Sequence, residues 1–137
     1  ALDYRELVAP MPLSQGRARI ESAVNGLIPM AGTGLYDTTR AAVQAVRDGY
    51  DTTKINAVLL LTDGMCDDWE PGCDLPPLIS FLSSSERDVV RGFAVAYGAD
   101  ADVETLQAIT DASQARLYKA TNPLTIEAVF QQVISNF

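Results

Sequence analysis

The chain has 137 residues, no histidine, and 18 Asp and Glu against 10 Lys and Arg, which gives a formal net charge of −8. This length suits a single domain with a sizeable core, and the acidic balance argues against nucleic acid or an anionic membrane surface as the partner. The absence of histidine excludes Ser-His and Cys-His nucleophile pairs, and no apolar run approaches the roughly 18 residues that a membrane span needs. The chain opens at Ala1 with an acidic segment rather than with Met or a signal peptide, so we expect it to be a piece of a longer protein.

The first part of the chain is predicted to be largely helical. Residues 7–9 are typical of the end of a strand. Ser14 is a good N-cap for a helix that ends at Pro29. The apolar positions of this helix recur on one face: Ile20, Val24, Leu27 and Ile28. A second helix is predicted over residues 33–48, with Leu35 and Val43 on its inner face.

The run from Ala57 to Thr62 is apolar and stops at Asp63 and Gly64, which is typical of a strand buried on both faces of a parallel sheet. Ligands of such sheets bind at the carboxyl ends of the strands, so Asp63 is a candidate functional residue. The alternative is a structural turn in which Asp63 caps the loop. Gly64 lets the backbone turn sharply beside it.

Two further strands are predicted over residues 89–97 and 115–118, and helices alternate with them. These helices begin at Asp74, at Asp100 or Asp102, and at Asn122. The last helix is expected to face the core with Ile126, Val129, Phe130, Val133 and Ile134. Alternation of strands and helices predicts an α/β fold: a three-layer, Rossmann-like parallel sheet with helices on both faces, here with three strands.

The turn Gly32-Thr33-Gly34 is a second candidate site. A Gly-x-Gly pair suggests a phosphate-binding turn, but a helix and Pro29 precede it where the dinucleotide motif needs a strand, and Asp37 would repel a pyrophosphate. We favour a tight turn that places the Thr33 hydroxyl at a helix N-terminus, and a plain N-cap is the alternative.

Cys66 and Cys73 are the two cysteines of the chain, and a disulfide between them is favoured over two free thiols. Closing a loop of about eight residues contributes roughly 2.5 kcal/mol in the chain-entropy model. A disulfide implies an oxidising, extracytoplasmic setting. Asp67, Asp68 and Glu70 lie between the cysteines, but their spacing does not match a twelve-residue calcium loop, so a solvated acidic loop is favoured.

Six short motifs follow one another in order: Ala31-Gly32-Thr33-Gly34-Leu35-Tyr36-Asp37, Leu61-Thr62-Asp63-Gly64, Val95-Ala96-Tyr97-Gly98, Leu106-Gln107-Ala108-Ile109, Ala115-Arg116-Leu117-Tyr118 and Val129-Phe130. Together they resemble the later half of the von Willebrand factor type A (vWA) domain, from about residue 7 to the end. The resemblance implies that residues 1–137 are a single, partial vWA domain and that the first strands of that domain would precede residue 1.

In that family three loops hold a divalent cation, usually Mg²⁺, in the metal-ion-dependent adhesion site (MIDAS). The resemblance implies that Thr33 is the second-loop ligand and Asp63 the third-loop ligand. The first-loop motif, Asp-x-Ser-x-Ser, is absent from this sequence. Because two oxygen ligands rarely hold Mg²⁺ against water, we expect this chain alone to bind the ion weakly or not at all.

The function implied by the resemblance is non-enzymatic protein binding or adhesion at the cell surface or outside the cell, dependent on a metal ion when the domain is intact. The protein ligand would be bound through an acidic side chain. One alternative is a hydrolase that uses Asp63, although residue 65 is Met rather than a second carboxylate. Another is an accessory subunit of an ATP-driven complex, whose cytosolic setting the cysteine pair disfavours.

The resemblance also bears on self-association. If the central strand of the family is absent, strand 57–62 has an unpaired apolar edge. We therefore expect the chain to form homo-oligomers, to swap segments, or to fold residues 1–14 across that edge.

Overall fold

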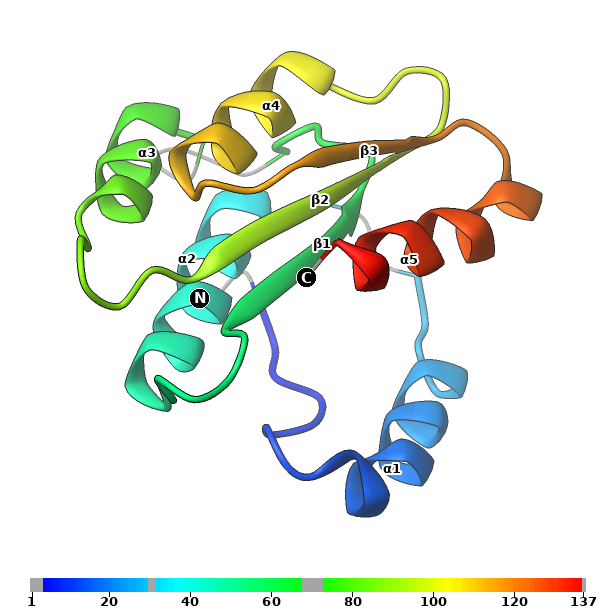
Figure 1. The fold of residues 1–137 in the computed structure, drawn as a ribbon. Helices are drawn as coiled ribbons and strands as arrows, with labels where there is room; N and C mark the ends of the chain where they lie inside the picture. Colours follow the sequence, from blue (N-terminus) through cyan, green and yellow to red (C-terminus); the bar gives the residue numbers. More distant parts are fainter. Residues whose placement is uncertain (1–3, 30–31, 68–72, 137) are drawn as a thin grey trace.

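The computed structural model describes residues 4–29, 32–67 and 73–136. Within these ranges the chain forms five α-helices, one short 3-10 helix and three strands (Figure 1). In chain order they are α1 (Leu13–Asn25), α2 (Leu35–Asp48), β1 (Ala57–Thr62), α3 (Leu75–Ser83), β2 (Arg91–Tyr97), α4 (Val103–Ala112), β3 (Leu117–Ala120), η1 (Pro123–Thr125) and α5 (Ile126–Ser135).

The three strands form one parallel sheet in the order β1-β2-β3. Leu60 of β1 lies opposite Ala94 of β2, and Val95 of β2 lies opposite Tyr118 of β3. Helices α2, α3 and α4 cover one face of this sheet, and α5 lies against the other (Figure 1). The predicted α/β class, with three parallel strands and flanking helices, is confirmed.

Two cores lie on opposite faces of the sheet. The larger core joins the sheet to α2, α3 and α4 through Val43, Leu78, Ala94, Leu106 and Ile109, together with six further buried residues. The smaller core joins the sheet to α5 through Phe93, Val95, Ala120, Val129 and Val133. Side chains of a strand alternate between faces, so β2 supplies both cores, and its residues 92–96 are all buried.

The prediction that strand 57–62 is buried on both faces is wrong. In β1 only Leu60 is buried, and Leu61 is 51% exposed. The reason is that β1 is an edge strand, while the buried residues of α5 pack mainly over β2 and β3. No strand among the described residues pairs with the free edge of β1, and residues 4–12 contain no strand, so residues 7–9 are not a strand end.

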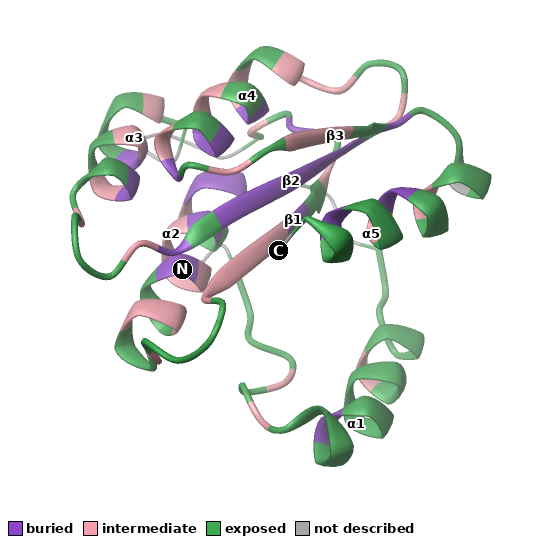
Figure 2. Cartoon of the chain, in the orientation of Figure 1, coloured by how far each residue is buried: buried purple, intermediate pink, exposed green. Residues whose placement is uncertain are grey.

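Helix α1 also differs from the prediction. It begins at Leu13 after the N-cap Pro12, so Ser14 lies inside the helix, and it ends at Asn25 before Pro29. Gly16 is its one buried residue, and Ile20 and Val24 are 43% and 57% exposed. The helix lies away from the sheet (Figure 1) and is exposed over most of its length (Figure 2). Periodicity identifies an apolar face here but not whether the rest of the chain covers it.

Most other boundaries shift by one or two residues, but α5 begins at Ile126, after η1, rather than at Asn122. Two predicted N-caps behave differently. Of the two predicted alternatives, Asp100 and Asp102, it is Asp102 that caps α4: its carboxylate accepts a hydrogen bond from the Thr105 N–H at 3.1 Å. Asp74 occupies the N-cap position of α3 without a side-chain cap bond. In α5, Ile134 is predicted to face the core but is 65% exposed.

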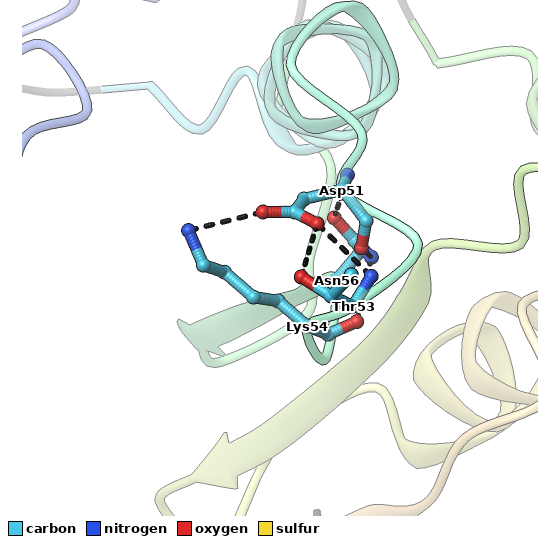
Figure 3. Close-up of polar contacts among 4 residues, drawn as sticks. All are labelled: Asp51, Thr53, Lys54 and Asn56. Carbon is cyan, nitrogen blue, oxygen red and sulfur yellow. Dashed lines mark hydrogen bonds and ion pairs between the residues drawn. The ribbon is translucent and has the colours of Figure 1, made fainter.

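A polar turn connects α2 to the amino end of β1 (Figure 3). One carboxylate oxygen of Asp51 accepts hydrogen bonds from the Thr53 hydroxyl at 2.6 Å and the Thr53 N–H at 2.9 Å. The other oxygen lies 3.0 Å from the Lys54 ammonium. Asn56 donates to the Asp51 carbonyl at 2.8 Å. The Thr53 hydrogen bonds, with help from Lys54, lower the pKa of Asp51 from 3.8 to about 2.

The lowered pKa of Asp51 predicts a pH-dependent contribution to stability. Because the folded state favours the ionised carboxylate, the contribution is complete above pH 3.8 and is lost as the pH falls towards about 2. The Asp51→Asn variant should therefore unfold at a lower temperature than the parent chain at neutral pH, and this difference should shrink near pH 2. Thermal unfolding followed by circular dichroism measures it.

Asp88→Asn is the matched control, because Asp88 is an exposed aspartate on another loop. This control should show no comparable pH-dependent difference from the parent. Equal destabilisation by Asp51→Asn at neutral pH and near pH 2 would contradict the assignment.

The open edge of β1 predicts self-association at high protein concentration. An apolar strand edge without charged residues pairs readily with another chain, and a lysine on such a strand prevents pairing. Light scattering over a concentration series should give a mass above the 14.7 kDa monomer for the parent and the monomer mass for Leu61→Lys. Leu124→Lys is the control and should still associate. Leu124 is also exposed, at 89%, but it lies in η1 and not on the edge strand β1. A strict monomer for the parent at every concentration would refute the expectation.

Candidate functional site at the carboxyl edge of the sheet

Three loops meet at the carboxyl edge of the sheet. The first precedes α2 and carries Thr33, the second follows β1 and carries Asp63, and the third leads from β2 to Asp102 at the start of α4. The second loop contacts both of the others by backbone hydrogen bonds. This edge is where open parallel sheets bind their ligands.

The backbone of Asp63 is held by a hydrogen bond, whereas its side chain is exposed to solvent. Its carbonyl oxygen accepts a hydrogen bond from the Asp102 N–H at 2.8 Å. Its carboxylate lies 3.4 Å from the Met65 N–H, which is a long hydrogen bond, and the residue is exposed. The loop cap proposed as the alternative role is therefore weak, and the carboxylate is accessible to a ligand.

Gly64 allows the second loop to pass close to α4. It is buried and has a φ of +78°, in the region that favours glycine. A Cβ at this position would lie 2.9 Å from the Leu106 side chain and 3.1 Å from the Asp102 carbonyl oxygen. The glycine after Asp63 is therefore required both by its backbone conformation and by close packing.

Thr33 lies beside the far end of the second loop. It forms an antiparallel β-bridge with Asp67, whose N–H donates to the Thr33 carbonyl at 3.2 Å. The residue is half-buried and lies before Gly34, the N-cap of α2, which has no side-chain cap bond. Thr33 is thus neither the first residue of α2 nor its N-cap, and the structure brings its loop against the loop of Asp63.

Thr33 and Asp63 alone are too few ligands to make a magnesium site. Mg²⁺ requires six oxygen ligands in near-octahedral geometry. The Thr33 hydroxyl and the Asp63 carboxylate supply two side chains. Within residues 4–29, 32–67 and 73–136, no group of three or more His, Cys, Asp or Glu side chains is placed to hold a metal ion. This donor set, taken alone, does not fit Mg²⁺.

Cys66 and Cys73 form a disulfide whose Cα atoms are 5.8 Å apart. Cys66 is half-buried and packs against the larger core, whereas Cys73 is exposed and directly precedes Asp74, the N-cap of α3. The disulfide therefore links the second loop to the start of α3. The enclosed acidic residues Asp68 and Glu70 lie outside the described residues, so the choice between a calcium loop and a solvated loop stays a prediction.

The backbone roles of Asp67 and Asp102 are not predicted by the sequence. The sequence identifies Asp67 only as one of the acidic residues between the cysteines, and Asp102 only as a possible helix cap. In the structure, their N–H groups hold the Thr33 and Asp63 loops in place. Every residue except proline has an N–H, so no side-chain pattern identifies these two.

The packing around Gly64 predicts a destabilising substitution. Gly64→Ala adds a clash with Leu106 to the cost of a left-handed residue, so the free energy of unfolding should fall by roughly 2–4 kcal/mol. Gly98→Ala is the matched control, because Gly98 has a φ of +91° but no atom beyond its own chain neighbours lies within 4 Å of the point where a Cβ would lie. That variant should lose only about 1 kcal/mol, the backbone cost alone. Urea unfolding measures both, and equal losses would contradict the role of the Leu106 contact.

No described helix combines the length and apolar character needed to cross a membrane. No protein-family model matches the sequence, and no curated protein is similar to it. Among solved structures, the chain is similar to an uncharacterized membrane spanning protein from Vibrio fischeri, at 13% identity and a TM-score of 0.46. The alignment covers 87% of this chain and 65% of the other, so the chain spans just under two thirds of that protein's length. A likeness this distant carries no inference about function.

Proposed function

We propose that this chain is the later part of a vWA-type domain and that the domain binds a protein ligand without catalysing a reaction. Binding depends on Mg²⁺ when the domain is intact, and the ligand contributes an acidic side chain. Thr33 and Asp63 are two of the ion's ligands. The remaining ligands come from the Asp-x-Ser-x-Ser segment that residues 1–137 lack.

The observation that carries the proposal is the meeting of the two motif loops. The Gly-Thr-Gly turn and the Leu-Thr-Asp-Gly strand end are far apart in the sequence, but the Asp67–Thr33 hydrogen bond joins their loops at one edge of the sheet. Both offer oxygen ligands, which a hard cation such as Mg²⁺ prefers. The exposure of Asp63 supports a site that a second protein can reach.

Two further features support a binding role outside the cytoplasm. The Cys66–Cys73 disulfide is typical of proteins in oxidising compartments, including the cell surface. Residue 65 is Met, and the sequence has no Gly-Lys-Ser or Gly-Lys-Thr phosphate loop, so the groups that a hydrolase would place beside Asp63 are not in this segment.

The test begins with the coding sequence upstream of Ala1, which should encode Asp-x-Ser-x-Ser. A chain extended to include that segment should bind Mg²⁺ in a calorimetric titration. Asp63→Asn should weaken this affinity at least about tenfold, because it removes a charged ligand. Asp88→Asn, which removes an exposed carboxylate elsewhere, should leave the affinity unchanged.

The 137-residue chain alone should show weak or no Mg²⁺ binding in the same titration. Three results would contradict the proposal: micromolar Mg²⁺ affinity of the short chain, an upstream sequence without the motif, or binding by the extended chain that is indifferent to Asp63→Asn.

A further inference from the structure

We propose that α1 of one copy of this chain covers the open face of β1 in a second copy, and that the exchange is reciprocal. The open face of β1 is the surface formed by Ala57, Leu59 and Leu61 on the α5 side of the sheet. Self-association of this kind does not require the Mg²⁺ site proposed above.

The open face of β1 is an apolar surface that the described helices leave uncovered. Ala57 and Leu59 pack at the margin of the smaller core and are only half-buried. Leu61 lies on the same side of the strand by alternation and is half exposed. Parallel sheets normally carry helices on both faces, but α5 packs mainly over β2 and β3. This side of β1 therefore lacks the helix that such sheets usually have.

Helix α1 presents a matching surface, the α1 stripe. Four exposed apolar side chains recur there at helical spacing: Leu13, Ile20, Val24 and, just past the end of the helix, Leu27. Residues 7–11 cover another side of α1, where the Met11 side chain lies against Gly16. Among the described helices and strands, none packs extensively against α1. The α1 stripe is therefore available to a second copy.

The two surfaces match in length. Helix α1 has 13 residues, and at about 1.5 Å per residue it is roughly 20 Å long. Strand β1 has 6 residues, and at about 3.3 Å per residue it is also roughly 20 Å long. One α1 helix can therefore cover the whole of β1.

The charges on α1 also suit a second copy. The helix carries Arg17 and Arg19 against a single acidic residue, Glu21, whereas the chain as a whole has a net charge of −8. Next to the open face of β1, the carboxylate of Asp63 is exposed two residues after Leu61. A cationic helix is attracted to such an acidic surface, which favours this orientation of the two copies over others.

A reciprocal exchange uses each surface once in each copy. The same contact then forms twice about a twofold axis, and the dimer is closed. In the structure α1 lies away from the sheet of its own chain (Figure 1), so both surfaces are presented to a partner. Two contacts, each made by a helix about 20 Å long and about 10 Å wide, bury on the order of 1,000 Å² in all. Interfaces of this size are weak, so we expect dimers only at high protein concentration.

The variant Val24→Lys tests the α1 stripe, because it places a charge in the stripe and leaves β1 unchanged. As concentration rises, light scattering should show the parent approaching twice the 14.7 kDa monomer mass, whereas Val24→Lys should keep the monomer mass. Gln15→Lys is the matched control. It adds the same charge at an exposed position on the other side of α1, and it should dimerise like the parent.

Strand pairing through the free edge of β1 gives a different result. In that case Val24→Lys would associate as the parent does, and this outcome would overturn the proposal. A parent chain that stays monomeric at every concentration would also overturn it. Circular dichroism should show the same helix content in the parent and both variants, so that a monomeric Val24→Lys reports a lost contact and not an unfolded α1.

Isotope-filtered NMR on a mixture of ¹³C-labelled and unlabelled chains identifies the contact itself. The methyl groups of Val24 in one copy should lie next to those of Leu61 in the other. Contacts between Val24 and Leu61 of the same copy would show that α1 covers its own sheet. Contacts between the Val24 residues of two copies would show that the helices pair with each other. Either result would overturn the exchange.

Discussion

The structure depends on the burial of β2 between two layers of helices. Residues 92–96 are all buried, and alternate side chains enter opposite cores. Phe93 and Val95 meet α5, whereas Ala94 and Ala96 meet the core formed with α2, α3 and α4. Since β1 and β3 both pair with this strand, its two-sided burial sets the position of their carboxyl ends. The candidate site lies at the carboxyl ends of β1 and of β2 itself.

The larger core supports both loops of the candidate site. Asp63 emerges directly from β1, and the contact of Gly64 with Leu106 ties its loop to a helix that is itself packed on the sheet. Thr33 lies two residues before Leu35, which is buried in the same core, and its loop meets the Asp63 loop through the Asp67 bridge. The Cys66–Cys73 disulfide lies next to this bridge in the sequence.

The least supported parts of the fold are α1 and the free edge of β1. Helix α1 has an apolar face with one buried residue, and Leu61 of β1 is half exposed. Hydrophobic periodicity records which side chains seek burial, but burial also requires a surface to cover them. In the described residues α5 reaches β2 and β3, while β1 keeps one edge without a strand partner.

The sequence by itself determined the α/β class, the order of the elements, an aspartate cap for α4 at Asp100 or Asp102, and the two loops that carry Thr33 and Asp63. Those features depend on local periodicity and on turn residues such as Gly64, which act within a few residues. Only the tertiary structure decided that β1 is an edge strand, that α1 stays exposed, and that the N–H groups of Asp67 and Asp102 join the loops. These depend on contacts between distant segments, which leave no local pattern in the side chains.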